Sequence, residues 1–331
     1  MELISHIGLL PGPAPSAGRV LRKIGAFFSL ALLFAFAIAN QIFSFWCHFA
    51  AIAWPRRISK LQRTISQFFW AVAIALAQYN KVEIRITGER ITADSAVIIS
   101  NHQSLADHIV LAHLAQSASI NYVPRVNFFT WFSLWNIPSI RLMLNMIACD
   151  ENWELTKSMA LALFKKISLS DIPEWIVVFP EVNIWTPTSA YLQRLQSLKY
   201  YLPQFDHLLY PRFSAINSAV SMAKTTGRHK FLNVYDVTIS YPQASAPTLA
   251  RFFCSAEPIR VFVHVRISPI SSIPSKRSKI EAWLERRWLE KDKRLARMRP
   301  GYNKFDTDDT HDTNNLNDLS KTGNLSGNAN G

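Results

Sequence analysis

One uncharged stretch constrains this chain more than any other feature of the sequence. Residues 24–54 contain no Asp, Glu, Lys or Arg over 31 positions, and two basic residues border the stretch at each end. A helix needs about 20 apolar residues to cross a bilayer, so this stretch is long enough to cross once. A second uncharged stretch, residues 64–80, is 17 residues long, near the lower limit for a crossing. We therefore expect two helices that enter or cross a membrane.

The topology of these helices stays open. Basic residues flank the first stretch on both sides, so the positive-inside rule does not choose between one crossing, a hairpin and a re-entrant pair. Pro55 separates the two stretches. A cleaved signal peptide fits less well, because its apolar segment is only about 7–15 residues long and precedes a small-residue cleavage site. The length of the stretch favours membrane anchoring.

Composition indicates a folded protein with an anionic partner. The 331-residue chain is 49% hydrophobic and 18% charged, which excludes a disordered chain and allows a buried core. Its 36 Lys and Arg exceed its 23 Asp and Glu, a bias that fits nucleic acid, a membrane surface or an acidic substrate. The three cysteines show no CxxC spacing, so we expect neither a disulfide framework nor a cysteine-ligated metal.

Beyond residue 80 the chain alternates between strand-like and helix-like segments. Residues 96–100 and 175–179 are continuous apolar runs, typical of strands that are buried on both faces. The alternation predicts an α/β fold with a mixed, mostly parallel sheet flanked by helices and preceded by the N-terminal membrane helices. The other expected strands are residues 81–87, 120–124, 233–241 and 259–267, and the expected helices are residues 107–114, 153–167 and 278–298.

Two segments near the carboxyl end differ from the rest of the chain. Residues 276–299 hold ten basic and four acidic residues, with Trp283 and Trp288 among them. A solvated helix that packs its tryptophans on the domain is the simpler interpretation, and contact with an anionic membrane or a phosphate is the alternative. Residues 301–331 are rich in Asp, Asn, Thr and Gly, so we expect a disordered tail.

Polar residues follow both of the buried strands. The first cluster contains His102 and Asp107, and the second contains Pro180 and Glu181. Because reactive groups gather at the carboxyl ends of strands in open α/β sheets, the two clusters could share one site. His102 in a loop would meet Asp107 in the first turns of a helix, with Ser104 as a helix cap. Asp107 would then fix the tautomer of His102 and leave Nε2 as a general base, although such a contact alone also occurs as a structural pair.

His108 and His113 are expected to be ordinary residues of the helix that follows His102. Their five-residue spacing puts them on different faces of a helix, where they cannot share one ligand. No further metal ligand lies near them in the sequence, so we expect no metal site.

The same residues carry a resemblance to a known family. NHQSLADH at residues 101–108 resembles the NHxxxxD motif of the glycerolipid (lysophospholipid) acyltransferase superfamily, and FPEV at residues 179–182 resembles its FPEG motif. Other blocks follow in the same order, and an ordered series is far more specific than one motif. They are YVPR from Tyr122 with Trp131 to Trp135, LYPR from Leu209, VYDVTISYP from Val234, and VFVHVRISPISSIP with the tryptophan-bearing helix, which is similar to the lysocardiolipin and acylglycerol-phosphate acyltransferase branch.

The resemblance, over roughly residues 80–300, implies an enzyme that moves an acyl chain from acyl-CoA to a hydroxyl of a lysophospholipid, lysophosphatidate or related glycerolipid. It implies that His102 deprotonates this hydroxyl and that Asp107 orients His102. Glu181 would belong to the block that binds the acceptor, while Arg125 and Arg212 would hold a phosphate, a task that suits guanidinium groups. The other motif residues expected to bind substrate are Asn101, Ser104, Pro180 and Pro211.

On this interpretation the chain has four parts. They are an N-terminal arm at residues 1–23, membrane-embedded helices at 24–80, an acyltransferase-like α/β domain with its basic helix at 81–300, and the tail at 301–331. The expected partners are a membrane, a lipid acceptor and acyl-CoA, which is a co-substrate, and no cofactor is implied. The endoplasmic reticulum is implied by the resemblance alone. Nucleic acid, suggested only by charge, is not an expected partner.

Two departures from the family pattern bear on activity. Val182 replaces the glycine of FPEG, and glycine permits backbone conformations that a β-branched residue resists. Asp150 and Glu151 lie where the family normally has a basic residue for the acceptor phosphate. The acceptor could lack a phosphate monoester, or a catalytically impaired relative could bind lipid or organise a membrane instead. Basic residues that could compensate from elsewhere are Lys157, Lys165 and Lys166.

Overall fold

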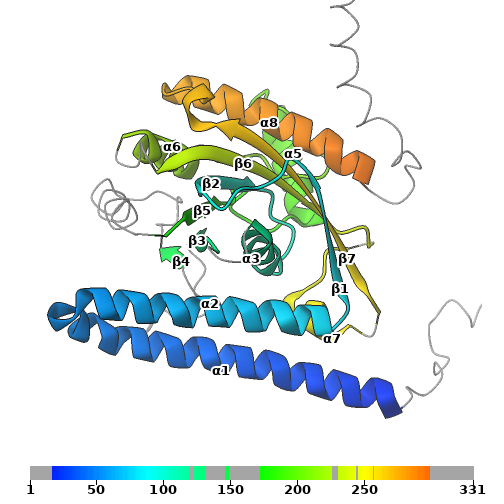
Figure 1. Cartoon of the computed structure of the whole chain (residues 1–331). Coiled ribbons are helices and arrows are strands. Elements are labelled where there is room, and N and C mark those ends of the chain that lie inside the picture. Colours follow the sequence, from blue (N-terminus) through cyan, green and yellow to red (C-terminus); the bar gives the residue numbers. More distant parts are fainter. Residues whose placement is uncertain are drawn as a thin grey trace, which may run out of the picture.

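A twisted sheet forms the centre of the protein in this computed structural model, which describes residues 17–118, 123–130, 146–148, 172–225, 230–243, 245–255 and 257–298. In this part of the chain the sheet has seven strands in the order β1-β7-β6-β2-β5-β3-β4 (Figure 1). The strands are β1 (Val82–Gly88), β2 (Ser95–Ser100), β3 (Arg125–Thr130), β4 (Met146–Ala148), β5 (Glu174–Val178), β6 (Phe231–Ser240) and β7 (Ile259–Pro269).

Most of the sheet is parallel. Strands β6, β2, β5, β3 and β4 run in one direction, whereas β7 pairs antiparallel with β6 and carries β1 parallel to itself at the edge. Every residue of β2 and β5 is buried, as their continuous apolar runs predict. The predicted α/β class with a mixed, mostly parallel sheet and flanking helices is therefore confirmed.

Helices cover both faces of the sheet. One core contains Ile98 and Val177 of the sheet and lies under α1, α2, α3 and α7. The other contains Val97 and Ile99 and lies under α6 and α8, on the far side of the sheet in Figure 1. The helices are α1 (Ala17–Ala53), α2 (Pro55–Tyr79), α3 (Asp107–Ala118), α5 (Pro187–Lys199), α6 (Ser214–Thr225), α7 (Leu249–Cys254), the 3-10 turn η2 (Ile270–Ser272) and α8 (Arg277–Met298).

Two long helices occupy the uncharged N-terminal region. Pro55 starts α2, where its missing N–H costs nothing and its ring ends α1. The helices run side by side in Figure 1, and Phe36 of α1 stacks on Phe69 of α2 with ring centroids 5.8 Å apart. Within the described residues, Phe27–Cys47 is the one segment long and apolar enough to cross a membrane. Because α1 already begins at Ala17, the expected arm at residues 1–23 does not end at a structural boundary.

Helix α8 packs its tryptophans on the domain. Trp283 and Trp288 are buried against the core on the α6 side, together with Leu284 and Leu295. Their spacing puts the apolar side chains on one face and the charges of the helix on the other. This arrangement agrees with the simpler interpretation of the basic segment, in which its tryptophans hold the helix to the domain.

Several expected elements differ from the observed ones. Of the strand expected at residues 120–124, only residues 123 and 124 are described, and neither is in a strand; β3 begins at Arg125, after Pro124, which lacks the N–H that a central strand needs. Helices α5, α6 and α7 were not anticipated, although Thr186 caps α5 by accepting the backbone N–H of Ser189 at 3.1 Å. Other expected features lie outside the described residues, namely the helix at residues 153–167, the tail at 301–331, Tyr122, Trp131 to Trp135, Asp150, Glu151 and Lys157, Lys165 and Lys166.

Candidate active site

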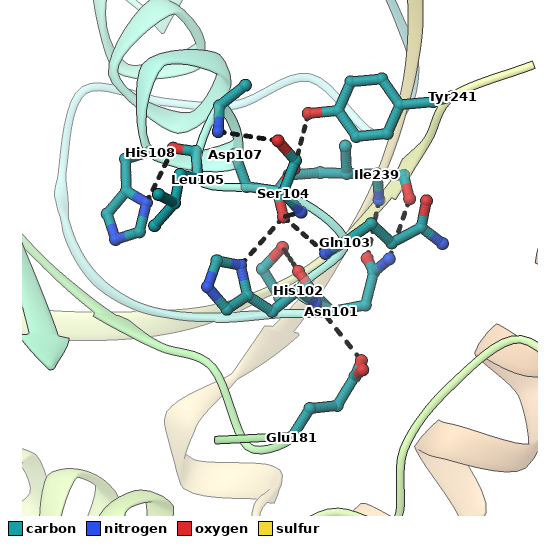
Figure 2. Close-up of polar contacts among 12 residues, drawn as sticks. Asn101, His102, Gln103, Ser104, Leu105, Asp107, His108, Glu181, Ile239 and Tyr241 are labelled. Carbon is teal, nitrogen blue, oxygen red and sulfur yellow. Dashed lines mark hydrogen bonds and ion pairs between the residues drawn. The ribbon is translucent and has the colours of Figure 1, made fainter. Parts of the chain in front are cut away.

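Two loops meet at the edge of the sheet where β2 and β5 end (Figure 2). These strands are parallel neighbours with Ile99 opposite Val178, so the residues after them emerge side by side. The backbone N–H of His102 donates to Oε1 of Glu181 at 3.3 Å, and the N–H of Trp185 donates to the carbonyl oxygen of His102 at 2.9 Å. The two polar clusters that follow the buried strands therefore form one site.

The carboxylate of Asp107 organises the first loop. Its Oδ2 lies 3.0 Å from Nδ1 of His102 and accepts the backbone N–H groups of Gln103 and Ser104 at 2.7 and 3.0 Å. Its Oδ1 accepts the hydroxyl of Tyr241 at 2.6 Å. The loop wraps around this carboxylate, which explains how His102 meets a residue five positions away without helical spacing.

His102 carries its proton on Nδ1, as the contact with Asp107 requires. An ionised carboxylate only accepts hydrogen bonds, so Nδ1 must donate. Nε2 then keeps its lone pair and is the atom that can remove a proton from a substrate. The ring also stacks on Phe179, with centroids 4.3 Å apart and planes at 24°, which limits its rotation. His102 therefore has the tautomer and the orientation of a general base.

A second imidazole lies beside His102. The ring centroids of His102 and His108 are 5.5 Å apart, and Nδ1 of His108 donates to the carbonyl oxygen of Leu105 at 3.1 Å. Burial, reinforced by the nearby His102, lowers the pKa of His108 from 6.5 to about 3. His108 thus stays neutral at physiological pH and does not take the proton from His102. It is buried in the site wall, so it is more than the ordinary helix residue we expected.

Asn101 and Ser104, which we expected to bind substrate, hold the loop in the structure. The Asn101 amide donates to the carbonyl oxygen of Ile239 and accepts its N–H, both at 2.8 Å, so it extends the pairing of β2 with β6. The Ser104 hydroxyl donates to the carbonyl oxygen of Pro247 and accepts the N–H of Ala106 at 3.0 Å. The Ser104 side chain thus caps its own loop and ties it to the segment around Pro247.

Glu181 joins the loop after β5 to a third loop. Its Oε2 accepts the N–H of Leu209 at 3.2 Å, and the N–H of Arg212 donates to the carbonyl oxygen of Pro180 at 2.7 Å. Pro211 is buried between them, while the Arg212 side chain is exposed at this edge. The segments that resemble three separate family blocks therefore lie together. Glu181 itself is only 1% exposed and bridges backbone groups.

Val182 has the left-handed backbone conformation that the glycine of FPEG would favour at this position. Its φ of 70° lies in the left-handed region, and the N–H of Asn183 closes a tight turn onto the carbonyl oxygen of Glu181 at 2.7 Å. A β-branched residue in this region costs about 1–3 kcal/mol, which glycine would avoid. The turn forms nonetheless, so the Glu181 carboxylate keeps both of its N–H partners despite the valine.

Arg125 does not belong to this site. It opens β3 opposite Glu174, the first residue of β5, so it lies at the amino edge of the parallel strands, whereas His102 lies at the carboxyl edge. Its guanidinium group contacts both oxygens of the fully buried Glu174 carboxylate, at 2.8 and 2.9 Å. Arg125, which the resemblance implies holds a phosphate, thus pairs with a buried carboxylate at the edge of the parallel strands opposite His102.

Two residues of the site were missed. Tyr241 follows the end of β6, the neighbour of β2, so the rule that placed His102 at a strand end would also have found it. Burial, and then Asp107, raises the pKa of Tyr241 well above its ordinary value, so its hydroxyl stays a donor. Lys291 of α8 reaches the end of β2 and donates to the carbonyl oxygen of Ile99 at 3.4 Å. The sequence of this charged helix gave no sign that one of its lysines is buried against the sheet.

Tyr241→Phe is expected to lower the rate about three- to ten-fold and the free energy of unfolding by about 1.5–3 kcal/mol. The variant removes one hydrogen bond from a buried carboxylate but leaves the contact between His102 and Asp107 intact. Steady-state kinetics and thermal unfolding measure the two effects. Tyr235→Phe is the matched control, since this tyrosine of β6 bonds Thr92 at 2.9 Å and lies away from His102, so it should lose stability alone.

Among the described residues, no group of three or more His, Cys, Asp or Glu side chains is placed to hold a metal ion. Cys47 and Cys254, the two cysteines in the described residues, are free thiols. The candidate site in the described residues comprises the His102 and Asp107 pair, its supporting loops and the exposed Arg212.

Comparison with known proteins points to one class of enzyme. Residues 251–316 match the family model described as acyltransferase C-terminus. The chain is 23% identical over 262 residues to lysocardiolipin acyltransferase 1 of Gallus gallus, covering 78% of this chain and 68% of that protein. It is 23% identical over 290 residues to the probable 1-acyl-sn-glycerol-3-phosphate acyltransferase 5 of Arabidopsis thaliana, covering 84% and 73%.

A solved structure is also similar to this chain. It is the crystal structure of the 1-acyl-sn-glycerophosphate acyltransferase PlsC from Thermotoga maritima, with a TM-score of 0.40 and 12% identity, covering 83% of this chain and 98% of that one. The matched family model and the curated relatives confirm the resemblance to glycerolipid acyltransferases of the lysocardiolipin and acylglycerol-phosphate type. The chain is thus similar to acyltransferases of lipid metabolism.

Proposed function

We propose that this protein is a membrane-bound acyltransferase that moves an acyl chain from acyl-CoA to a hydroxyl of a lysophospholipid, lysophosphatidate or related glycerolipid. The observation that carries the proposal is the 3.0 Å contact between Nδ1 of His102 and Asp107, within a loop that three further donors hold in place. This arrangement supports a general base at Nε2, directly at the edge of the sheet where lipid and thioester would meet.

The reaction needs no nucleophile from the protein. Nε2 of His102 removes the proton of the acceptor hydroxyl, and the oxygen of this hydroxyl attacks the carbonyl carbon of the thioester. The tetrahedral intermediate then collapses with cleavage of the C–S bond, and the departing thiolate of coenzyme A takes the proton from the imidazolium. Asp107 stabilises the imidazolium between these steps, as a carboxylate does in a serine-type triad.

An apolar cavity next to the site could receive an acyl chain. It has a volume of about 290 Å³ and lies between α1, α2, α3 and α7. Ile109, two residues after Asp107, forms part of its wall, and Phe34 and Phe253 line it from α1 and α7. Lipid-binding pockets are mostly apolar with few polar groups, which supports this assignment for the acyl chain.

Helix α1 supports attachment to a membrane. Phe27–Cys47 has the length and composition of a crossing segment, and large side chains such as Phe28 and Trp46 are about two-thirds exposed on its surface. Exposed apolar surface of this extent is typical of a membrane contact. One crossing and a hairpin formed with α2 are both compatible with these helices. The endoplasmic reticulum remains a proposal from the resemblance.

The acceptor is defined less sharply than the reaction. Of the two arginines expected to hold a phosphate, Arg212 bonds Pro180 through its backbone N–H at the His102 edge, while Arg125 pairs with Glu174 at the opposite edge. Among the described residues, this leaves one guanidinium group of the two at that edge, which is compatible with an acceptor that carries a phosphodiester or another weakly charged headgroup. A glycerolipid that lacks an exposed phosphate monoester is therefore a member of the proposed acceptor class.

A panel of lysolipids tests the proposal. Purified protein in detergent is incubated with labelled acyl-CoA and each acceptor, and lipid products are separated and counted. A labelled product that disappears in His102→Ala supports acyl transfer with this base. If no acceptor is acylated although the lipids bind, the protein is a catalytically impaired relative that binds lipid, which is the alternative function.

A further inference from the structure

Helix α5 carries its apolar side chains on the face that points away from the domain. Four large side chains of this helix are between 48 and 63% exposed, namely Tyr191, Leu192, Leu195 and Leu198. Their spacing puts them on one side of the helix. The opposite side is polar, because Ser197 is buried there and the side chain of Gln193 accepts the backbone N–H of Tyr210. This is the reverse of a helix that packs its apolar side on a domain.

Basic residues border the apolar side of α5. The helix carries Arg194 and Lys199 and no acidic residue, and their positions fall on either side of the apolar stripe. Arg194 pairs with Asp206 at 2.6 Å, and Nζ of Lys199 lies 5.3 Å from the ring centre of Tyr200. Tyr200 and Tyr201 continue the exposed surface beyond the helix, at 61 and 96% exposed. Leucine and tyrosine between basic flanks are typical of a helix that lies in the interface of an anionic bilayer.

Helix α5 leaves the sheet at the same edge as the His102 loop. Trp185, just before α5, donates its N–H to the carbonyl oxygen of His102 at 2.9 Å. Tyr210, which bonds α5, packs on the core under α6 and α8. On the other face of the sheet, Phe27 of α1 is 65% exposed and lines a cavity with Phe253 of α7, the helix that follows β6. The His102 loop therefore lies between two exposed apolar surfaces, one on each face of the sheet.

We propose that α5 is a second membrane contact, whose leucine and tyrosine side chains enter the interface of an anionic bilayer while α1 holds the protein there. Burial of the apolar side chains provides the affinity, and the basic flanks add attraction to anionic headgroups. With both surfaces against lipid, the His102 edge of the sheet faces the bilayer that supplies the acceptor. The contact itself does not depend on acyl transfer, whereas its effect on the rate rests on the proposed function.

Quenching by spin-labelled lipid tests the contact directly. Leu195→Cys, in a background with the native cysteines replaced by alanine, is labelled with an environment-sensitive fluorophore. The protein is reconstituted into vesicles of phosphatidylcholine and phosphatidylglycerol in equal amounts. We expect blue-shifted emission, and a loss of fluorescence when the lipids carry a nitroxide close to the headgroup.

Leu232→Cys is the matched control for this experiment. Leu232 is 53% exposed near the start of β6, at the opposite edge of the sheet, so its label is expected to keep its fluorescence. Equal quenching of the two labels would overturn the proposal. A second copy of the chain is the competing occupant of α5. Oxidation of dilute Leu195→Cys protein in detergent is expected to give no more disulfide-linked dimer than Leu232→Cys, and a dimer specific to Leu195→Cys would also overturn the proposal.

Leu192→Glu combined with Leu195→Glu tests the effect of the contact on the reaction. The variant removes apolar surface and places carboxylates against anionic headgroups, so KM for a lysolipid presented in the same vesicles is expected to rise about ten-fold. Both leucines are exposed, so the fold is expected to be retained. Activity on a short-chain lysolipid dissolved as monomers should not change, and Leu232→Glu should change neither value.

The two measurements separate this inference from the proposed function. An unaltered KM in vesicles, with label on α5 that the lipids do not quench, overturns the membrane contact. A wild-type protein that acylates no lysolipid overturns only the proposed function, because quenching of the label on α5 is measured without turnover.

Discussion

His102→Ala is expected to slow acyl transfer at least about 100-fold. A positioned general base contributes about 10²–10⁴ to a rate, and the 3.0 Å contact with Asp107 gives His102 the tautomer that this role needs. Asp107→Asn is expected to lose up to about 10⁴-fold, because the negative charge that stabilises the imidazolium is gone and the amide no longer fixes the Nδ1–H tautomer. Initial rates with labelled acyl-CoA, at matched amounts of folded protein, measure both losses.

A variant of a different histidine, on helix α3, controls for general damage to the fold. His113 lies on α3, one and a half turns beyond His108, and burial lowers its pKa without any contact to the catalytic pair. His113→Ala is expected to keep the wild-type rate within about two-fold, since it removes no group of the proposed mechanism. Full activity in His102→Ala would exclude the mechanism, and equal losses in both variants would show that the assay reports folding.

Arg125→Met is expected to lower the free energy of unfolding by about 3 kcal/mol and to leave the kinetics of folded protein unchanged. The variant leaves the fully buried Glu174 carboxylate without its ion-pair partner, and only the amide of Asn127, 2.9 Å away, still donates to it. Breaking a buried pair from one side costs about 3–5 kcal/mol, and the remaining amide places this case at the lower end. Denaturant unfolding in detergent measures the loss.

Arg212→Met is the matched variant, with the opposite expected outcome. The Arg212 side chain is exposed, so its loss should change stability by less than about 0.5 kcal/mol. Its position beside the loop of Pro180 and Glu181 predicts a higher KM for an anionic acceptor. A stable Arg125→Met protein with a raised KM would return Arg125 to the binding site. Arg125→Met combined with Glu174→Gln should recover part of the lost stability, because neither charge is then left unpaired.

The central strands could be predicted from the sequence because a strand buried on both faces appears as a continuous run of apolar residues. Strands β2 and β5 appear as uninterrupted apolar runs; β2 begins one residue earlier than expected, and β5 is shifted by one residue at both ends. The pairing of His102 with Asp107 followed from the same reasoning, since both come after a buried strand. These features depend on local sequence, which is why they could be anticipated.

The partners of the catalytic loop could not be predicted in the same way. Tyr241, Pro247 and Leu209 reach it through contacts between residues far apart in the chain, and a single sequence does not reveal such contacts. Arg125 was misplaced because its motif names a residue type without saying at which end of a strand it lies. Arg125 is the first residue of β3 and lies opposite the buried Glu174. It therefore forms an ion pair within the fold.

The sequence separation of the contacts that hold the His102 loop also sets when these contacts can form during synthesis. The bonds that hold the catalytic loop join residues 134, 138 and 143 positions apart, and Lys291 reaches back 192 positions to Ile99. Helix α2 is complete about 200 residues before Lys291 is made, a delay of about 10–40 s at ordinary rates of translation. On the proposed function, α1 and α2 can therefore reach the bilayer while the ribosome is still making the residues that hold His102 in place.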